Sequence, residues 1–181
     1  SDFVSGAAEK LVLANQQHEV IVVEGQGSLF HPRYSGVTLG LLHGVMPHGL
    51  ILVYEMGRAA IYGMEQIALA PLATVVDFYE AAANIMHPCR VIALAVNGHR
   101  FSDEEVAEHC AQMENELGLP ACDVIRHGPD ELVQATLDFQ KDLKARGVPG
   151  GLAIAIVAGA IVIVGLLLGW LVGGSMNDFT A

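Results

Sequence analysis

The sequence predicts an α/β domain, built on a mostly parallel sheet flanked by helices, followed by a C-terminal transmembrane helix. Strand-like and helix-like segments alternate through residues 1–146, and such alternation is typical of parallel sheets. Beyond them, residues 151–174 form a run of 24 residues without a charge. A helix of that length crosses a hydrocarbon core of about 30 Å. We therefore expect an α/β domain at 1–146, a linker at 147–150, a membrane span at 151–174 and a short tail at 175–181.

The expected strands are short, mostly apolar segments, and the first of them, 20–23, is a continuous β-branched run that suits a strand buried on both faces. They lie at 20–23, 50–54, 90–96 and 122–125. The expected helices have apolar residues on one face, and they lie at 4–17, 37–46, 59–69, 74–86, 102–117 and 129–146. Ser102 and Glu105 have the spacing of a capping box, which marks the start of a helix.

Polar residues and glycines gather where the expected strands end, and ligands of parallel sheets bind at those carboxyl ends. Glu24 ends the first strand, where an unpaired carboxylate is costly. Such a carboxylate can accept a metal ion such as Mg²⁺, a substrate hydroxyl or an amine. The structural alternative is that Glu24 caps the next helix or pairs with Arg33 or Arg58. The residues that follow are Gly25, Gln26, Gly27 and Ser28. We expect their backbone N–H groups and the Ser28 hydroxyl to form a nest that binds an anion.

Basic side chains lie near this loop and near the other strand ends. His31 is the best candidate for a catalytic base among eight histidines, because it lies beside the Glu24 loop. Arg33, Arg58 and Arg100 are candidates for binding a carboxylate or phosphate in a bidentate manner, with ordinary surface ion pairs as the alternative. The loop matches none of three known motifs. The dinucleotide-binding motif G-x-G-x-x-G would need glycine at position 30, which is Phe30. Neither the Walker A motif G-x-x-x-x-G-K-[ST] nor the nucleophile elbow G-x-S-x-G occurs in the sequence.

Charge and cysteine content exclude some classes of partner. The net charge is −11 and the sequence has no basic stripe, so nucleic acid is not an expected partner. The three cysteines are far apart and form no C-x-x-C pair. This pattern predicts a reducing compartment and argues against a disulfide or zinc framework.

The flanks of the apolar run predict its orientation in a membrane. Lys141, Lys144 and Arg146 precede the run. The positive-inside rule then places the α/β domain in the cytoplasm. Because there is one apolar run, we expect a single-pass membrane protein. A G-x-x-x-G spacing, which allows two such helices to form a homo-oligomer, recurs at Gly165, Gly169 and Gly173.

Three blocks of the sequence resemble a known family, namely EVIVVEGQGSLFHPRYSGVTLGLLHG at 19–44, LVYEMGR at 52–58 and VIALAVNGHRFSDEE at 91–105. They look like the C-terminal half of a P-loop-type family, formerly of unknown function, that is linked to D-glutamate N-acetyltransferases using acetyl-CoA. VVEGQGS is also similar to VVEGAGG of dethiobiotin synthetases, where the glutamate lies at a magnesium and substrate site. The resemblance implies a P-loop NTPase-like sheet, with Glu24 near the ligand and Asn97 near a nucleotide base. Measured against that family, the chain is expected to be a fragment that lacks the N-terminal half.

The resemblance implies that the chain is an N-acetyltransferase-like domain. It would act in D-amino acid metabolism of the bacterial type. Its substrate would be a small amino acid such as D-glutamate, with acetyl-CoA as donor. Glu24 would orient or deprotonate the amine, the loop from Gly25 to Ser28 would hold an anionic group, and Arg58 would bind a carboxylate. Two alternatives stay open: an ATP-dependent ligase of the dethiobiotin synthetase kind, and a catalytically inert, membrane-anchored module that binds a partner. The sequence therefore leaves open whether the chain is itself an enzyme.

Overall fold

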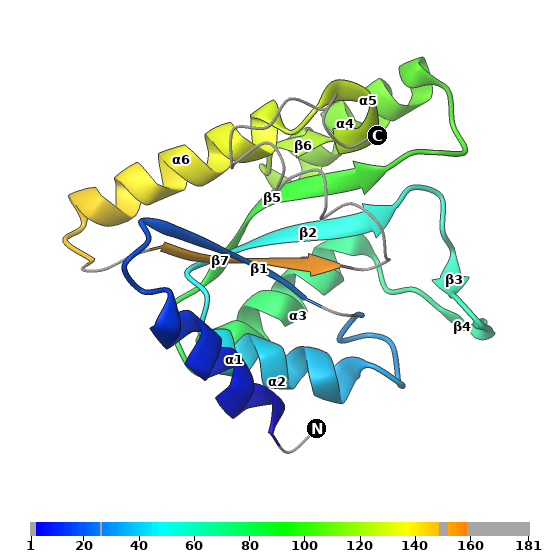
Figure 1. Cartoon of the computed structure of the whole chain (residues 1–181). Coiled ribbons are helices and arrows are strands. Elements are labelled where there is room, and N and C mark those ends of the chain that lie inside the picture. Colours follow the sequence, from blue (N-terminus) through cyan, green and yellow to red (C-terminus); the bar gives the residue numbers. More distant parts are fainter. Residues whose placement is uncertain (1–2, 26, 149–151, 159–181) are drawn as a thin grey trace, which may run out of the picture.

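The strands assemble into a five-stranded sheet in which neighbouring strands run parallel (Figure 1). The computed structural model describes residues 3–25, 27–148 and 152–158. In spatial order the strands are β1 (Val20–Glu24), β7 (Leu152–Ala158), β2 (Gly49–Glu55), β5 (Arg90–Asn97) and β6 (Ala121–Cys122). A separate antiparallel hairpin consists of β3 (Ala60–Ile61) and β4 (Met64–Ala68).

Helices cover both faces of the sheet, so the predicted α/β class is confirmed. The helices are α1 (Val4–Ala14), α2 (Ser35–Val45), α3 (Leu72–Asn84), α4 (Asp103–Leu117), α5 (Val124–His127) and α6 (Asp130–Ala145). Figure 1 shows α1, α2 and α3 on one side of the sheet and α6 on the other. Successive side chains of β2 point alternately to the two faces of the sheet, as in any pleated strand. Leu50 and Leu52 join a core cluster with α3 and α4, whereas Ile51 and Val53 join a cluster with α6.

Helix α4 begins and ends as its sequence predicts. The backbone N–H of Glu105 donates to the Ser102 hydroxyl at 3.2 Å, and the backbone N–H of Ser102 donates to the Glu105 carboxylate at 2.8 Å. This capping box satisfies N–H groups that the first turn of a helix leaves unpaired. Gly118 ends the helix at a φ of +66°, a left-handed conformation that glycine adopts without steric cost.

The prediction of a transmembrane helix over residues 151–174 is wrong. Its first part is β7, which pairs with β1 on one side and with β2 on the other. Within the described ranges, no helix is both long enough and apolar enough to cross a membrane. The single-pass membrane localisation that we expected from this helix is therefore not supported. A strand enclosed by two others in a parallel sheet is as continuously apolar as a membrane helix, so the lack of charge did not distinguish them. Residues 159–174, including the G-x-x-x-G glycines, lie outside the described residues.

Two shorter segments also differ from the prediction. The helix expected at 59–69 is the β3–β4 hairpin, whose turn includes Gly63 at a φ of +72°; this glycine favours a turn over a continuous helix. The strand expected at 122–125 ends at Cys122, because the Asp123 carboxylate accepts a hydrogen bond from the backbone N–H of Ile125 at 3.0 Å and thereby caps α5.

Strand β1 is less enclosed than its β-branched sequence predicts. It is an edge strand of the sheet, with β7 as its one neighbour in the sheet. Its residues from Val20 to Val23 are half-buried, and Glu24 is exposed. A run of β-branched residues indicates a strand, but whether both of its faces are covered depends on its place in the sheet.

Candidate functional site

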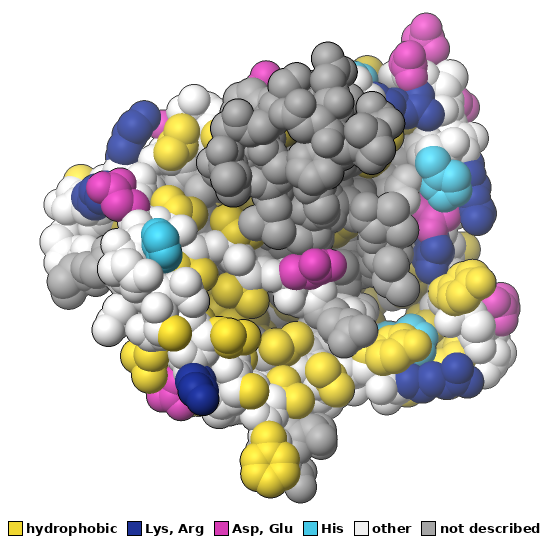
Figure 2. Space-filling view, in the orientation of Figure 1, with side chains coloured by type: hydrophobic (Ala, Val, Ile, Leu, Met, Phe, Trp, Pro, Cys, Tyr) yellow, Lys and Arg dark blue, Asp and Glu magenta, His cyan; other side chains and the backbone are white. Residues whose placement is uncertain are grey.

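The carboxyl edge of the sheet carries the residues that the sequence singles out. The strand arrowheads in Figure 1 point toward the same side of the molecule, and on that side Figure 2 shows lysine or arginine and histidine side chains close together. The chain has 9 basic residues against 20 acidic ones. An arginine nevertheless follows each of four strands at this edge, namely Arg33, Arg58, Arg100 and Arg126. The edge is therefore the part of an acidic protein that is best suited to an anionic ligand.

The loop after β1 is anchored to helix α3. The backbone N–H of Leu29 donates to the Tyr79 hydroxyl at 3.0 Å, and the Tyr79 side chain is fully buried. Burial raises the pKa of this phenol, which stays a neutral hydrogen-bonding group as a result. Ser28 turns its hydroxyl toward its own loop, where it accepts a hydrogen bond from the backbone N–H of Phe30 at 3.1 Å. The Ser28 hydroxyl thus supports the loop in this structure, and its contact with an anion remains a prediction.

Gly27 is required by the shape of this loop. Its φ is +72°, and a Cβ at this position would lie 2.5 Å from the Cβ of Tyr34. A side chain would therefore meet both backbone strain and a steric clash. Gln26 lies outside the described residues, so the nest of N–H groups expected from Gly25 to Ser28 stays a prediction.

His31 and Arg33 lie in the same loop, as their sequence positions imply. The Nδ1 atom of His31 accepts a hydrogen bond from the backbone N–H of Arg33 at 3.2 Å, and the His31 ring lies 4.5 Å from the ring of Tyr34. Because Nδ1 is the acceptor, the imidazole carries its proton on Nε2 when it is neutral. The Arg33 residue is exposed, and its guanidinium forms no ion pair with another residue of the described ranges. It is free to bind an anion from solution.

Glu55 is the residue of this edge that sequence reasoning missed. Its side chain is only 5% exposed, and it forms an ion pair with Arg58 and a second with Nε of Arg100 at 3.5 Å. The Arg58 guanidinium also lies 5.5 Å from the centre of the Tyr62 ring. One buried carboxylate therefore orients two guanidinium groups, and it neutralises only one of their two charges. The signal was available, because Glu55 directly follows an apolar strand, as Glu24 does, and stands three residues before an arginine.

Asn97 and its neighbours form a second polar group at the end of β5. The Asn97 side-chain oxygen accepts a hydrogen bond from the backbone N–H of His99 at 3.3 Å and lies 3.0 Å from Nδ1 of His99. Nε of Arg100 donates to Nε2 of His99 at 3.2 Å. The Asn97 amide is therefore used locally, and a contact of Asn97 with a nucleotide base remains a prediction.

The buried carboxylate of Asp123 holds the loop after β5 in place. Asp123 is 2% exposed and accepts a hydrogen bond from the backbone N–H of Gly98 at 3.0 Å. Arg126 pairs with Asp123 and with Asp103, and it donates to the Gly98 carbonyl at 3.1 Å. Arg126 is thus committed to the protein itself, unlike the other three arginines of the edge, which retain donors for a ligand.

Glu24 does not form the structural contacts that we considered as an alternative. Helix α2 has no side-chain cap, and Arg58 pairs with Glu55 instead. The strand register explains the separation, because Glu24 is level with Ile156 of β7, which is level with Ile51 of β2. Glu55 lies four residues further along β2. Two strand spacings separate the Cα atoms of Glu24 and Glu55 by about 10 Å across the sheet, and four residues separate them by about 13 Å along the strands. Together these components place the two Cα atoms about 16 Å apart. The two carboxylates are therefore too far apart to share one arginine, and a small ligand could lie between them.

Metal binding at Glu24 would need ligands beyond those described. No group of three or more histidine, cysteine or acidic side chains suited to a metal ion occurs within the described ranges. Mg²⁺ usually keeps several waters and is held by one or two carboxylates together with phosphate oxygens. Glu24 alone is compatible with that pattern only if a phosphate-containing ligand supplies further oxygens.

Comparison with known proteins gives consistent matches. A family model described as "Domain of unknown function (DUF1611_C) P-loop domain" matches residues 1–133. A D-glutamate N-acetyltransferase from Pseudoalteromonas sp is 35% identical over 134 residues, which are 74% of this chain and 40% of the relative. A D-glutamate N-acetyltransferase from Tritonibacter scottomollicae is 36% identical over 136 residues, which are 75% of this chain and 41% of the relative.

A solved structure agrees with these relatives. The crystal structure of a DUF1611 family protein from Anabaena variabilis superposes with a TM-score of 0.72 at 33% sequence identity, covering 76% of this chain and 41% of that chain. The chain thus spans about two fifths of the length of the proteins that it matches.

Proposed function

Because the chain belongs to the DUF1611 family of P-loop domains, we propose that it forms the anion-binding part of an N-acetyltransferase. The acceptor would be a small amino acid such as D-glutamate, and the donor would be acetyl-CoA. Two relatives at 35% and 36% identity that are named D-glutamate N-acetyltransferase carry this proposal. The carboxyl edge supports it, since D-glutamate and acetyl-CoA are both anionic and this edge concentrates the arginines of an acidic chain.

Glu24 would act on the attacking amine. Its carboxylate is exposed at the end of β1 and has no ion-pair partner within the described ranges, so it is free to accept a proton. Attack of the amine nitrogen on the thioester carbon forms the new C–N bond and breaks the C–S bond. The proton that the nitrogen loses passes to Glu24, and the CoA thiolate leaves and is protonated. A positioned general base of this kind contributes about 10²- to 10⁴-fold to a reaction rate.

The arginines would bind the charged groups of the two substrates. Arg33 lies in the loop that follows Glu24 and suits a carboxylate near the reacting amine. Arg58 and Arg100 are further along the edge, and their shared Glu55 leaves one net positive charge for a carboxylate or phosphate. Guanidinium groups bind both kinds of anion in a bidentate manner.

Acetyl-CoA consumption in the presence of D-glutamate tests this proposal. Because the chain spans 40% of the Pseudoalteromonas relative, the assay uses that relative and its variant with glutamine at the residue aligned with Glu24. We expect kcat to fall by about 10²-fold or more while acetyl-CoA still binds. Equal kcat values would remove Glu24 from the mechanism.

The P-loop description of the family favours one further candidate, an ATP-dependent ligase of the dethiobiotin synthetase kind. That function requires binding of a magnesium–nucleotide complex, which acetyl transfer does not. Equilibrium dialysis of the chain against ATP with Mg²⁺ and against acetyl-CoA separates the two candidates. Retention of ATP alone would favour the ligase, and retention of acetyl-CoA alone would favour the acetyltransferase.

A further inference from the structure

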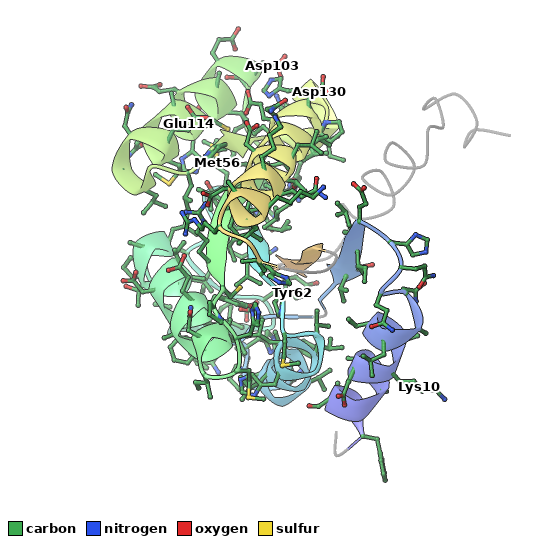
Figure 3. All side chains as sticks on the ribbon, turned by 90° about the vertical axis from the view of Figure 1, so that its left-hand side faces the viewer. Lys10, Met56, Tyr62, Asp103, Glu114 and Asp130 are labelled. Atoms are coloured by element: carbon green, nitrogen blue, oxygen red, sulfur yellow. The ribbon has the colours of Figure 1, made fainter. Side chains whose placement is uncertain are left out.

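The β3–β4 hairpin lies at the carboxyl edge of the sheet, directly after Arg58. The backbone N–H of Leu69 donates to the Ala59 carbonyl at 3.0 Å and closes the base of the hairpin. Figure 1 shows the hairpin beyond the end of β2, and Figure 3 shows the labelled Tyr62 on the side of the sheet where α2 and α3 lie. The hairpin pairs its two strands with each other and with no strand of the large sheet. It therefore forms a separate wall beside the arginines of the edge.

An aromatic ring in the turn of this hairpin is open to solvent. Tyr62 is 78% exposed, and its ring centre lies 5.5 Å from the Cζ atom of Arg58. A guanidinium at that distance is attracted by the face of an aromatic ring, so Arg58 keeps the ring close to the edge. Ile67 of β4 and Leu69 after it are also exposed. Apolar surface beside a few charged groups is typical of ligand sites, and Tyr62 offers such a surface next to a guanidinium.

The turn that carries Arg58 is fixed before any ligand arrives. The backbone N–H of Met56 donates to the Asn97 carbonyl at 3.0 Å, which joins this turn to the end of β5. Gly57 has a φ of +74°, and a Cβ there would lie 2.5 Å from the Cζ atom of Phe101. The turn therefore packs closely on the Phe101 ring. A binding group that is already held in position loses little freedom when a ligand binds.

A guanidinium beside an open aromatic ring suits a nucleotide better than other ligands. Guanidinium groups bind phosphate in a bidentate manner, and aromatic side chains stack on the planar face of a base. A simple carboxylate would use the arginines and leave Tyr62 in water. A cationic ligand would be repelled, because Arg58 and Arg100 carry two positive charges against the single charge of Glu55.

We propose that Tyr62 stacks on the base of an adenine nucleotide whose phosphates are bound by Arg58 and Arg100. This inference rests on the proposed function, in which the nucleotide is the adenine end of acetyl-CoA. Coenzyme A has its adenine and phosphates at one end and its thioester at the other. The Cα atoms of Glu24 and Glu55 are about 16 Å apart, so the nucleotide end lies at β2 and β5 while the thioester extends toward Glu24.

Calorimetric titration of the full chain with adenosine 3′,5′-bisphosphate tests the proposal, because this ligand has the base and phosphates but no acyl arm. We expect Tyr62→Leu to bind it about tenfold more weakly than the unchanged chain, since a base loses its aromatic partner. Tyr62→Phe keeps the ring and should bind nearly as well as the unchanged chain. The control is Phe3→Leu, at another exposed aromatic residue, and it should leave the affinity unchanged. Equal affinities of Tyr62→Leu and the unchanged chain, or no binding by the unchanged chain, would overturn the proposal.

Inorganic pyrophosphate separates stacking from an indirect effect of Tyr62 on Arg58. Its affinity is measured by competition with the bisphosphate. We expect Tyr62→Leu to leave the pyrophosphate affinity unchanged, because pyrophosphate has no base, whereas Arg100→Gln should weaken both ligands. Equal weakening of both ligands by Tyr62→Leu would overturn stacking on Tyr62. Absence of competition would overturn the assignment of the phosphates to the arginines.

Acetyl-CoA in the same titration distinguishes this inference from the proposed function. If acetyl-CoA binds and Tyr62→Leu does not weaken it, the stacking on Tyr62 is wrong and the proposed function stands. If the bisphosphate binds in a manner that depends on Tyr62 and acetyl-CoA does not bind, the nucleotide site stands and the proposed donor is wrong.

Discussion

The guanidinium of Arg58 forms an ion pair with the buried carboxylate of Glu55 at the end of β2. Arg100, at the end of the neighbouring strand β5, pairs with the other oxygen of the same carboxylate at 3.5 Å. The cluster thus links two strand ends at the edge where ligands of parallel sheets bind. It also explains why Arg58 is not the partner of Glu24.

Glu55→Gln is expected to destabilise the protein. The substitution removes the charge that balances Arg58, whose side chain is 23% exposed, and Arg100, whose side chain is 70% exposed. Because both arginines reach water, we expect a loss of about 1–2 kcal/mol, less than the full cost of breaking a buried pair. Urea unfolding measures the change. Glu104→Gln, at an exposed position of α4, is the control and should change the free energy of unfolding by less than about 0.5 kcal/mol. A similar effect of both substitutions would contradict the role of Glu55.

Gly44→Ala is expected to disturb the contact between α1 and α2. The added Cβ would lie 2.3 Å from the Ser5 carbonyl oxygen, so one helix must move. We expect the free energy of unfolding to fall by about 1–3 kcal/mol. Gly36→Ala in the same helix is a matched control, because nothing lies within 4 Å of its added Cβ. The control should stabilise the helix by up to about 1 kcal/mol, since alanine favours helix over glycine. If both variants are stabilised in thermal or urea unfolding, the proposed close contact is wrong.

His109 is expected to make stability depend on pH. Its Nε2 lies 2.8 Å from the Tyr54 hydroxyl, and burial lowers the pKa of His109 below its ordinary value of 6.5, against an opposing effect of Glu116. The unfolded chain therefore takes up this proton at a higher pH than the folded chain does. Stability from this group is present above pH 6.5 and is lost as the pH falls from there through the folded pKa.

Urea unfolding at two pH values checks this expectation. Between about pH 7.5 and pH 5.5, the free energy of unfolding should fall more in the unchanged protein than in His109→Gln, because the variant has no proton to take up at this position. An equal fall in both proteins would contradict a pKa shift of His109.

Much of the fold could be predicted from local sequence. The capping box at Ser102, the glycine at 118 and the β-branched run of β1 depend on neighbouring residues, and each predicted the correct element. The hairpin at 60–68 was missed because its residues also have a helical pattern, which is overridden by the turn at Gly63. The place of β7 could not be predicted, because a strand in the middle of a parallel sheet and a membrane helix are both uninterrupted apolar runs.

The sequence predicted that polar residues gather at the strand ends, but not which contacts they form; whether a ligand binds there stays a prediction. Strand ends with polar residues point to the carboxyl edge, and the structure brings Glu24, His31 and Arg33 to that edge. The pairing of Arg58 with Glu55 depends on the spatial order of the strands, which puts β7 between Glu24 and β2. Strand order is a property of the tertiary fold, so the sequence alone did not reveal which carboxylate Arg58 would meet.

Titration of the full chain with acetyl-CoA tests most directly whether this edge is the anion-binding site of an acetyltransferase. We predict that the unchanged chain binds acetyl-CoA and that Arg58→Gln and Arg100→Gln each weaken binding by about tenfold or more, as loss of a charged hydrogen bond implies. Arg90→Gln is the matched control, because Arg90 pairs with Asp142 at the opposite end of β5, and it should bind as the unchanged chain does. Absence of binding, or equal affinity of all four proteins, would contradict the account.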